Sequence, residues 1–366
     1  MLTRFSVTNY LGFPQKITWD LSKPRDYAFN AHLIRNGIVK NGIIYGANGS
    51  GKSSLGKALF DIVGLVNNQF LTDYSRAIYQ GNISGLMDFD YCLKFDGGTE
   101  VEYSYSKNIS GQLVKEALHR SGAEIFSRDG ESLSICDEFP IETEMKKRLA
   151  SSSNAVSILK FIVGTYPLTS DHYIQKLMNF ISSMLWFRCL DERNYIGIDS
   201  GVVRIEDYII RNGYLEEFAD FLREESGQSF DFSPTAVEHH AISCRIGGNV
   251  TSFQSIMSTG TRSLELLFYW TKRMREAHTS LVFIDEFDAF YHYELSINVC
   301  RMLFAQDFQV FLSSHNTMLL SNDFLRPDCG FYIKDNRIAA LCECTSRGEL
   351  RHGHNIEKMY RAGAFD

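Results

Sequence analysis

The chain has 366 residues, 44% of them hydrophobic, and a formal net charge of −7 at pH 7. This length and content predict a globular protein of one large α/β domain or two smaller ones, and the acidic balance argues against a broadly basic nucleic-acid surface. The 8 cysteines form no CxxC pair and no regular framework, and no apolar run is long enough for a signal peptide or a membrane span. We therefore expect a soluble, cytoplasmic protein with reduced thiols and no membrane partner.

The N-terminal segment predicts strands. Phe5, Val7 and Tyr10 alternate with polar residues, and a second strand-like segment follows at Lys16–Leu21. Together they predict a hairpin at a sheet edge.

A phosphate-binding loop, GANGSGKSS, follows the apolar run Gly42–Tyr45 and precedes a helical pattern. Its residues are Gly46, Ala47, Asn48, Gly49, Ser50, Gly51, Lys52, Ser53 and Ser54. The glycines allow backbone N–H groups to approach a phosphate closely, Lys52 supplies charge for the β- and γ-phosphates, and Ser53 offers a hydroxyl to Mg²⁺. This strand–loop–helix context is the form of Walker A and predicts binding of a nucleoside triphosphate such as ATP.

The middle of the chain changes character. Strands at Asp88–Phe95 and Glu100–Tyr105 flank Gly97-Gly98 and predict a second hairpin. Segments such as Ile174–Phe187 and Ile205–Leu222 then show helical spacing of apolar residues. We expect three parts: an N-terminal half of an ATPase head at 1–125, a mainly helical inserted lobe at 126–245, and the other half of the head at 246–366.

The segment Met257–Ser263 precedes an expected helix at Leu264–Met274. Ser258, Gly260 and Thr261 could bind a γ-phosphate at the N-terminus of this helix. Because Lys52 already binds the γ-phosphate within the same chain, these residues would contact the nucleotide of another subunit. The alternative is that Ser258 is only an N-cap.

The apolar run that starts at Ser280 ends in Asp285 and Glu286, the form of Walker B. Asp285 is placed to reach Mg²⁺, together with Ser53, and Glu286 to orient or deprotonate the attacking water. A further apolar strand, beginning at Val310, ends at His315. A histidine there can sense the γ-phosphate, so Glu286 and His315 are the expected catalytic residues.

With the signature segment, Walker B and histidine in this order, the sequence resembles the ABC-type AAA ATPases related to SMC and OLD-family proteins, which recur in prokaryotic antiphage loci. Further similarities lie in Tyr103–Tyr105, Val114–Leu118, Ile125–Arg128, Leu325–Asp328 and Ile356–Gly363, and in Asp285–Tyr293, where His292 is kept and Tyr293 replaces the family's proline. The resemblance implies an α/β head with a mixed sheet and flanking helices, which binds ATP and Mg²⁺. It also implies a homodimer or higher homo-oligomer in which two heads enclose the nucleotide, with Asp288 at the interface.

The resemblance also implies a sensor or regulatory subunit of an antiphage system of the PARIS, Septu or retron-associated kind, with a phage-derived trigger and a separate nuclease or toxin as effector. One alternative is an SMC-like repair or recombination head that acts on DNA directly. Another is a toxin site within 126–245, with His172, His239 and His240 as its only pointers. The family's Q-loop glutamine has two candidates, Gln69 and Gln80, and neither stands in a convincing sequence context. Too few residues follow His315 for a Toprim-like nuclease.

Overall fold

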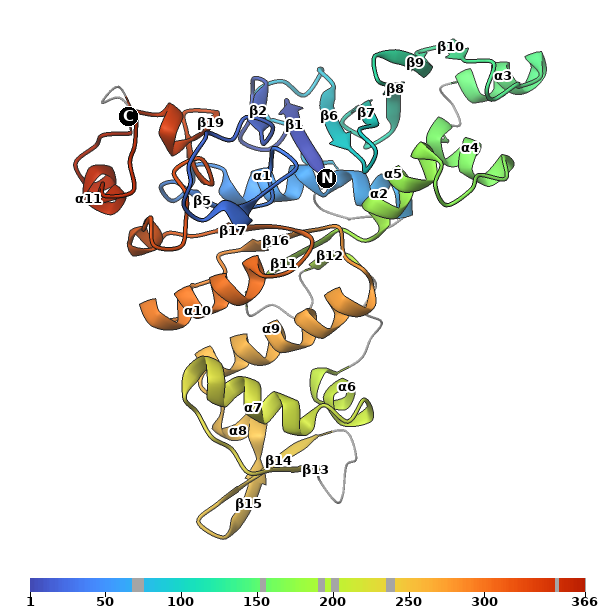
Figure 1. Cartoon of the computed structure of the whole chain (residues 1–366). Helices are drawn as coiled ribbons and strands as arrows, with labels where there is room; N and C mark the ends of the chain where they lie inside the picture. The colour runs from blue at the N-terminus through green and yellow to red at the C-terminus, as the bar shows by residue number, and fades with distance from the viewer. Residues whose placement is uncertain are drawn as a thin grey trace.

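The computed structural model describes residues 1–67, 76–151, 156–189, 195–198, 204–234, 241–345 and 349–365. Within these ranges the chain forms two sheets of seven strands each, with helices between and beyond them (Figure 1). This arrangement confirms the predicted α/β class, with a mixed sheet and flanking helices.

The first sheet is antiparallel and has the order β10-β9-β8-β7-β6-β1-β2. Its strands are β1 (Leu2–Thr8), β2 (Ile17–Asp20), β6 (Met87–Lys94), β7 (Glu100–Lys107), β8 (Leu113–Arg120), β9 (Ala123–Asp129) and β10 (Ser132–Ile135). Both predicted hairpins are confirmed, β1 with β2 and β6 with β7. The second turns at Gly97 and Gly98, whose φ angles of 89° and 85° suit glycine.

The second sheet has the order β12-β11-β16-β17-β5-β18-β19, with parallel inner strands and an antiparallel strand at each edge. Its strands are β5 (Asn41–Tyr45), β11 (Leu185–Arg188), β12 (Tyr195–Gly197), β16 (Leu281–Asp285), β17 (Gln309–Ser313), β18 (Gly330–Lys334) and β19 (Arg337–Ala340). Every residue of β5, β16 and β17 is buried, as expected for a parallel sheet covered on both faces.

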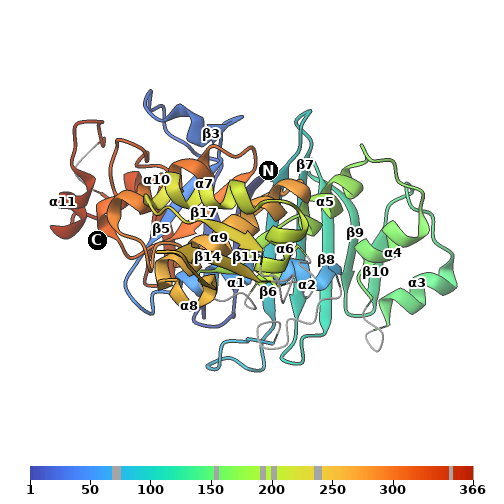
Figure 2. The same cartoon turned by 90° about the horizontal axis from the view of Figure 1, so that it is seen from below.

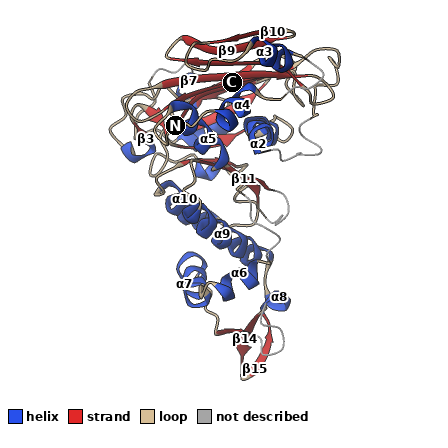
Figure 3. Ribbon diagram, turned by 90° about the vertical axis from the view of Figure 1, so that its right-hand side faces the viewer, coloured by secondary structure: helices blue, strands red, loops and turns tan. Residues whose placement is uncertain are grey.

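Helix α1 (Lys52–Leu59) lies between the two sheets, followed by α2 (Asp61–Asn67), while α9 (Thr259–Glu276) and α10 (Tyr293–Phe304) lie beyond the second sheet (Figures 1 and 3). On one side of α1, the hydroxyl of Tyr91 donates to the carbonyl of Ala58 at 3.1 Å. On the other, a Cβ at Gly56 would come within 2.8 Å of the Phe283 ring. A glycine is therefore needed where α1 approaches the second sheet.

The interval 126–245, expected as one inserted lobe, contributes elements to several parts of the fold. Helices α3 (Thr143–Ala150), α4 (Ile158–Thr165) and α5 (Tyr173–Ser182) follow the first sheet, strand β11 enters the second sheet, and α6 (Ile205–Arg211) and α7 (Leu215–Ser226) pack against α9 (Figure 2). A small sheet of β13 (Phe232–Pro234), β14 (Ile242–Ile246) and β15 (Asn249–Ser252) lies near α8 (Phe253–Ile256). The division of the chain at residues 125 and 245 stays a prediction.

Two helical segments expected from the sequence also differ in detail. The stretch Ile174–Phe187 forms α5 only to Ser182 and then enters strand β11. The sequence does not distinguish the two, because a strand buried on both faces has the same unbroken apolar run as a buried helix. The stretch Ile205–Leu222 is divided into α6 and α7 at Gly213, whose φ of 70° ends the first helix.

The remaining elements are short. They are β3 (Ile34–Arg35), β4 (Ile38–Val39), α11 (Ile356–Arg361) and 3₁₀ turns at Ala31–Leu33, Thr317–Leu319 and Leu341–Glu343. No helix in the described ranges is long and apolar enough to cross a lipid bilayer.

Candidate nucleotide-binding site

Three of the sequence motifs meet at one edge of the second sheet. Strands β16, β17 and β5 are parallel neighbours, so the loops that follow them leave the sheet on the same side. These loops begin at Glu286, Ser314 and Gly46 respectively. The sheet order therefore brings Walker B, the histidine motif and Walker A together although they lie far apart in the sequence.

The phosphate loop has the backbone shape that its glycines allow. Gly49 and Gly51 have φ angles of 79° and 105°, and a Cβ at Gly51 would come within 2.7 Å of the Phe13 ring. A Cβ at Gly46 would lie 2.7 Å from the carbonyl oxygen of Ile333. These positions exclude larger residues, which explains the glycine spacing. Ala47 and Asn48, at the tip of the loop, are exposed.

The side chain of Lys52 lies against its own loop. Its ammonium donates to the carbonyl oxygens of Gly46 at 2.8 Å and Ala47 at 3.2 Å, and only 5% of the residue is exposed. Burial lowers the pKa of Lys52, while the nearby charges of Asp285 and Glu286 raise it. A buried cation that donates to the carbonyl oxygens of its own loop is suited to exchange these contacts for phosphate oxygens.

His315 lies next to Lys52, with 3.4 Å between its Nδ1 and the lysine Nζ. Burial, and then the charge of Lys52, lower the pKa of His315, so the imidazole is neutral at pH 7. Because the ammonium can only donate, Nδ1 accepts and the ring proton is on Nε2. The Nε2–H is then a donor for an anionic oxygen.

The Asp285 carboxylate is fully buried at the end of β16. Its Oδ1 accepts a hydrogen bond from the Ser313 hydroxyl at 2.7 Å, whereas Oδ2 is buried without a hydrogen-bond partner within the described chain. An unsatisfied buried carboxylate oxygen is costly and indicates a missing cation or water. Mg²⁺ is commonly held by one or two protein oxygens together with substrate phosphates, so Asp285 fits such a site, and Ser53, in the first turn of α1, stays the predicted second ligand.

Glu286 has an unusual backbone and a partner that the sequence did not reveal. Its φ is 51°, its backbone N–H donates to the Ser313 hydroxyl at 2.8 Å, and its Oε2 accepts from Arg188, with 3.2 Å to the arginine Nε. Arg188 ends β11 and is directly paired with Asp285 across the two strands. The sequence does not point to Arg188, because the apolar run before it has the pattern of a helix as well as that of a buried strand. Its position beside Asp285 follows only from the pairing of β11 with β16.

The signature residues are not brought into this cluster. Ser258 is the N-cap of α9, and its hydroxyl oxygen accepts the backbone N–H of Thr261 at 3.1 Å. The Thr261 hydroxyl donates to Gln228 at 3.0 Å, and Gly260 lies close to the Phe290 backbone. The local geometry is that of the N-cap alternative, and a role toward a second subunit remains a prediction.

Other candidates lie elsewhere. The ring of His172 caps α5 and contacts Glu138 at 2.9 Å, which is a structural role. Gln80 is exposed and donates to the nearby carbonyl of Ile78. Gln69, His239 and His240 lie outside the described residues.

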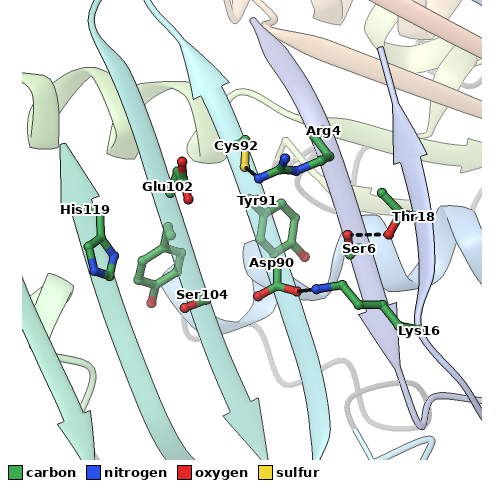
Figure 4. A pocket seen from close by; sticks show the side chains of 11 residues that line it. Arg4, Ser6, Lys16, Thr18, Asp90, Tyr91, Cys92, Glu102, Ser104 and His119 are labelled. Carbon is green, nitrogen blue, oxygen red and sulfur yellow. Dashed lines mark hydrogen bonds and ion pairs between the residues drawn. The ribbon is translucent and has the colours of Figure 1, made fainter. Parts of the chain in front are cut away.

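A hollow of about 460 Å³ on the outer face of the first sheet contains none of the predicted site residues (Figure 4). It is lined by alternating polar side chains that form local pairs, Lys16 with Asp90 and Ser6 with Thr18. We interpret it as the solvated face of an antiparallel sheet.

No family model matches the chain, and no curated protein matches it. Among solved structures it is similar to an SMC head bound to the C-winged helix domain of ScpA (14% identity, TM-score 0.45, covering 92% of this chain and 96% of that chain). It is also similar to the SMC head domain from Thermotoga maritima (15% identity, TM-score 0.43, covering 92% of this chain and 97% of that chain). A third similar structure is that of the recombination mediator protein RecF with ATP (13% identity, TM-score 0.42, covering 92% of this chain and 96% of that chain).

Proposed function

We propose that this chain binds ATP with Mg²⁺ and hydrolyses it as an ABC-type ATPase head. The observation that carries the proposal is the meeting of Lys52, His315 and the partnerless Asp285 oxygen beside a glycine-shaped loop. A buried cation, a neutral imidazole donor and a buried carboxylate at the N-terminus of a helix are the groups needed to hold a polyphosphate and its metal.

In this proposal each residue has one task. The loop N–H groups and Lys52 bind the phosphates, His315 donates Nε2–H to a terminal phosphate oxygen, and Asp285 with Ser53 holds Mg²⁺, which neutralises charge on the phosphates. Glu286 orients a water molecule and accepts its proton.

We further propose that two heads close around nucleotide. Lys52 and His315 lie side by side and would hold the terminal phosphate within one chain, whereas Ser258, at the N-terminus of α9, lies outside this cluster. A second copy would bring the nucleotide of one head to the Ser258 segment of the other, and Asp288 would lie near this interface.

The test of ATP binding compares Lys52→Ala with Lys40→Met. Lys40 is also a buried lysine bonded to backbone carbonyls, those of Phe304 and Gln306, but it lies outside the site. We expect Lys52→Ala to weaken ATP binding by roughly 10- to 100-fold, the loss of one charge-assisted hydrogen-bonding group, and Lys40→Met to leave it unchanged at matched folded fraction. Equal affinity of Lys52→Ala and wild type, measured by calorimetry, would refute the nucleotide site.

For the biological role, we propose a sensor or regulatory subunit of an antiphage system with a separate effector. The support is the sequence resemblance in motif order and in the Leu325–Asp328 and Ile356–Gly363 segments. The alternative is an SMC-like head acting directly on DNA in repair or recombination. Phage plating on cells that carry the chain with and without its neighbouring genes tests the first role, and sensitivity to DNA damage tests the second.

A further inference from the structure

We propose that Arg188 is a positioning residue for hydrolysis, which holds the Glu286 carboxylate through Oε2 and leaves Oε1 to the attacking water. The inference rests on the proposed ATPase function. Arg188 donates to Oε2 from two of its nitrogens, and both contacts are to that single oxygen. An arginine that blocked the carboxylate would take both oxygens in the parallel, forked pairing that guanidinium and carboxylate groups commonly adopt.

The backbone around this pair is fixed on both sides. Arg188 and Asp285 are direct partners on the parallel strands β11 and β16, so Glu286 is the first residue after that pair. The Glu286 N–H is held by Ser313. Its φ of 51° is unfavourable for a side chain larger than glycine, and such a conformation persists where the surroundings impose it. Ser313 therefore fixes the glutamate backbone and Arg188 fixes the side chain.

An ordinary surface ion pair is the competing explanation, because the side chains of Arg188 and Glu286 are 44% and 33% exposed and exposed pairs often contribute little to stability. A surface pair would leave catalysis unchanged when broken. A positioning residue would change kcat with little effect on KM, since it orients the base without contacting the nucleotide.

The experiment measures kcat and KM for ATP in Arg188→Ala and Arg188→Lys. General-base catalysis contributes about 10²–10⁴-fold in rate, and we expect loss of its orientation to remove part of this, lowering kcat by about tenfold with KM unchanged. Arg188→Lys should have a kcat between those of Arg188→Ala and wild type, because an ammonium keeps the positive charge but lacks the planar group of N–H donors. Arg223→Ala is the control, since it breaks another exposed arginine–carboxylate pair, with Asp220.

A double mutant separates positioning from a structural role. If Arg188 acts through Glu286, Arg188→Ala should have no further effect in the Glu286→Gln background under single-turnover conditions. A kcat for Arg188→Ala equal to or above wild type, or an equal loss in both backgrounds, would overturn the proposal. Should Arg188→Ala fail to fold, a wild-type kcat in Arg188→Lys would overturn it. Wild-type protein without ATPase activity would instead refute the proposed function itself.

Discussion

The hydroxyl of Ser313 donates to the buried carboxylate of Asp285 at 2.7 Å, and its oxygen accepts the N–H of Glu286 at 2.8 Å. One side chain on β17 therefore fixes both Asp285, at the end of the neighbouring strand, and Glu286, the residue that follows it. We predict that Ser313→Ala destabilises the protein by about 1–3 kcal/mol, since buried groups lose their partner, and raises the Mg²⁺ concentration needed for half-maximal ATPase activity. Ser296→Ala, a buried serine on α10, is the control and should leave the Mg²⁺ requirement unchanged.

Glu286→Gln should bind ATP normally but hardly turn over. The amide keeps the shape of the side chain and removes only the proton-accepting carboxylate, so the ground-state contacts of the phosphates remain. Binding by calorimetry and phosphate release measure the two properties separately, and size-exclusion chromatography with ATP should show an accumulated dimer. Equal turnover by Glu286→Gln and wild type would refute the assignment of this carboxylate.

A mixing experiment tests the action of Ser258 on a second head. Lys52→Ala and Ser258→Arg should each be inactive alone, whereas a mixed dimer keeps one site with both residues intact and should recover activity. Because Ser258 also caps α9, Ser258→Asp is a useful companion. It keeps a good N-cap but repels phosphate, so we expect wild-type stability with lost ATPase activity. Mixed dimers without any recovery would contradict the sandwich.

The buried ion pair of Asp61 with Lys107 joins the start of α2 to strand β7 of the first sheet. Asp61 begins α2, directly after the phosphate-loop helix, and also accepts from the Tyr105 hydroxyl at 2.7 Å. We predict that Lys107→Met costs about 3–5 kcal/mol, because it leaves a buried charge without its partner. Breaking the exposed Lys115–Asp129 pair on the same sheet by Asp129→Asn should not measurably change the denaturation midpoint.

The purified chain should not cut nucleic acid. Within the described residues no group of three or more His, Cys, Asp or Glu side chains could hold a metal ion, and His172 is engaged with Glu138. With ATP and Mg²⁺ or Mn²⁺, plasmid DNA and total tRNA should stay intact, and expression without the neighbouring genes should not protect against phage. Cleavage that survives Glu286→Gln but is lost on changing His172, His239 or His240 would show an effector site within this chain.

The glycine loop and the two acidic residues could be predicted because each has a local pattern, a strand followed by a residue type that its chemistry requires. Their roles in ATP binding stay predictions, while the strands that lead to them run parallel in one sheet. Arg188 could not be predicted in the same way, because its role depends on β11 entering the sheet beside β16. Its run Leu185–Phe187 is buried on both faces and therefore has no alternation. For Ser258 the sequence allows both an N-cap and a phosphate contact to a second subunit, and the structure shows the N-cap.

The position of β5 has a consequence for synthesis of the chain. Its neighbours are β17 and β18, and the first paired residues, Asn41 and Val310, are separated by well over half of the 366-residue chain. At typical ribosomal speeds of about 5–20 residues per second, the apolar strand is made on the order of tens of seconds before either neighbour exists. Both of its edges stay open during that time, and such edges invite pairing with other chains. Nascent protein is thus most exposed to aggregation before residue 309 emerges, and we expect chaperones to act in that interval.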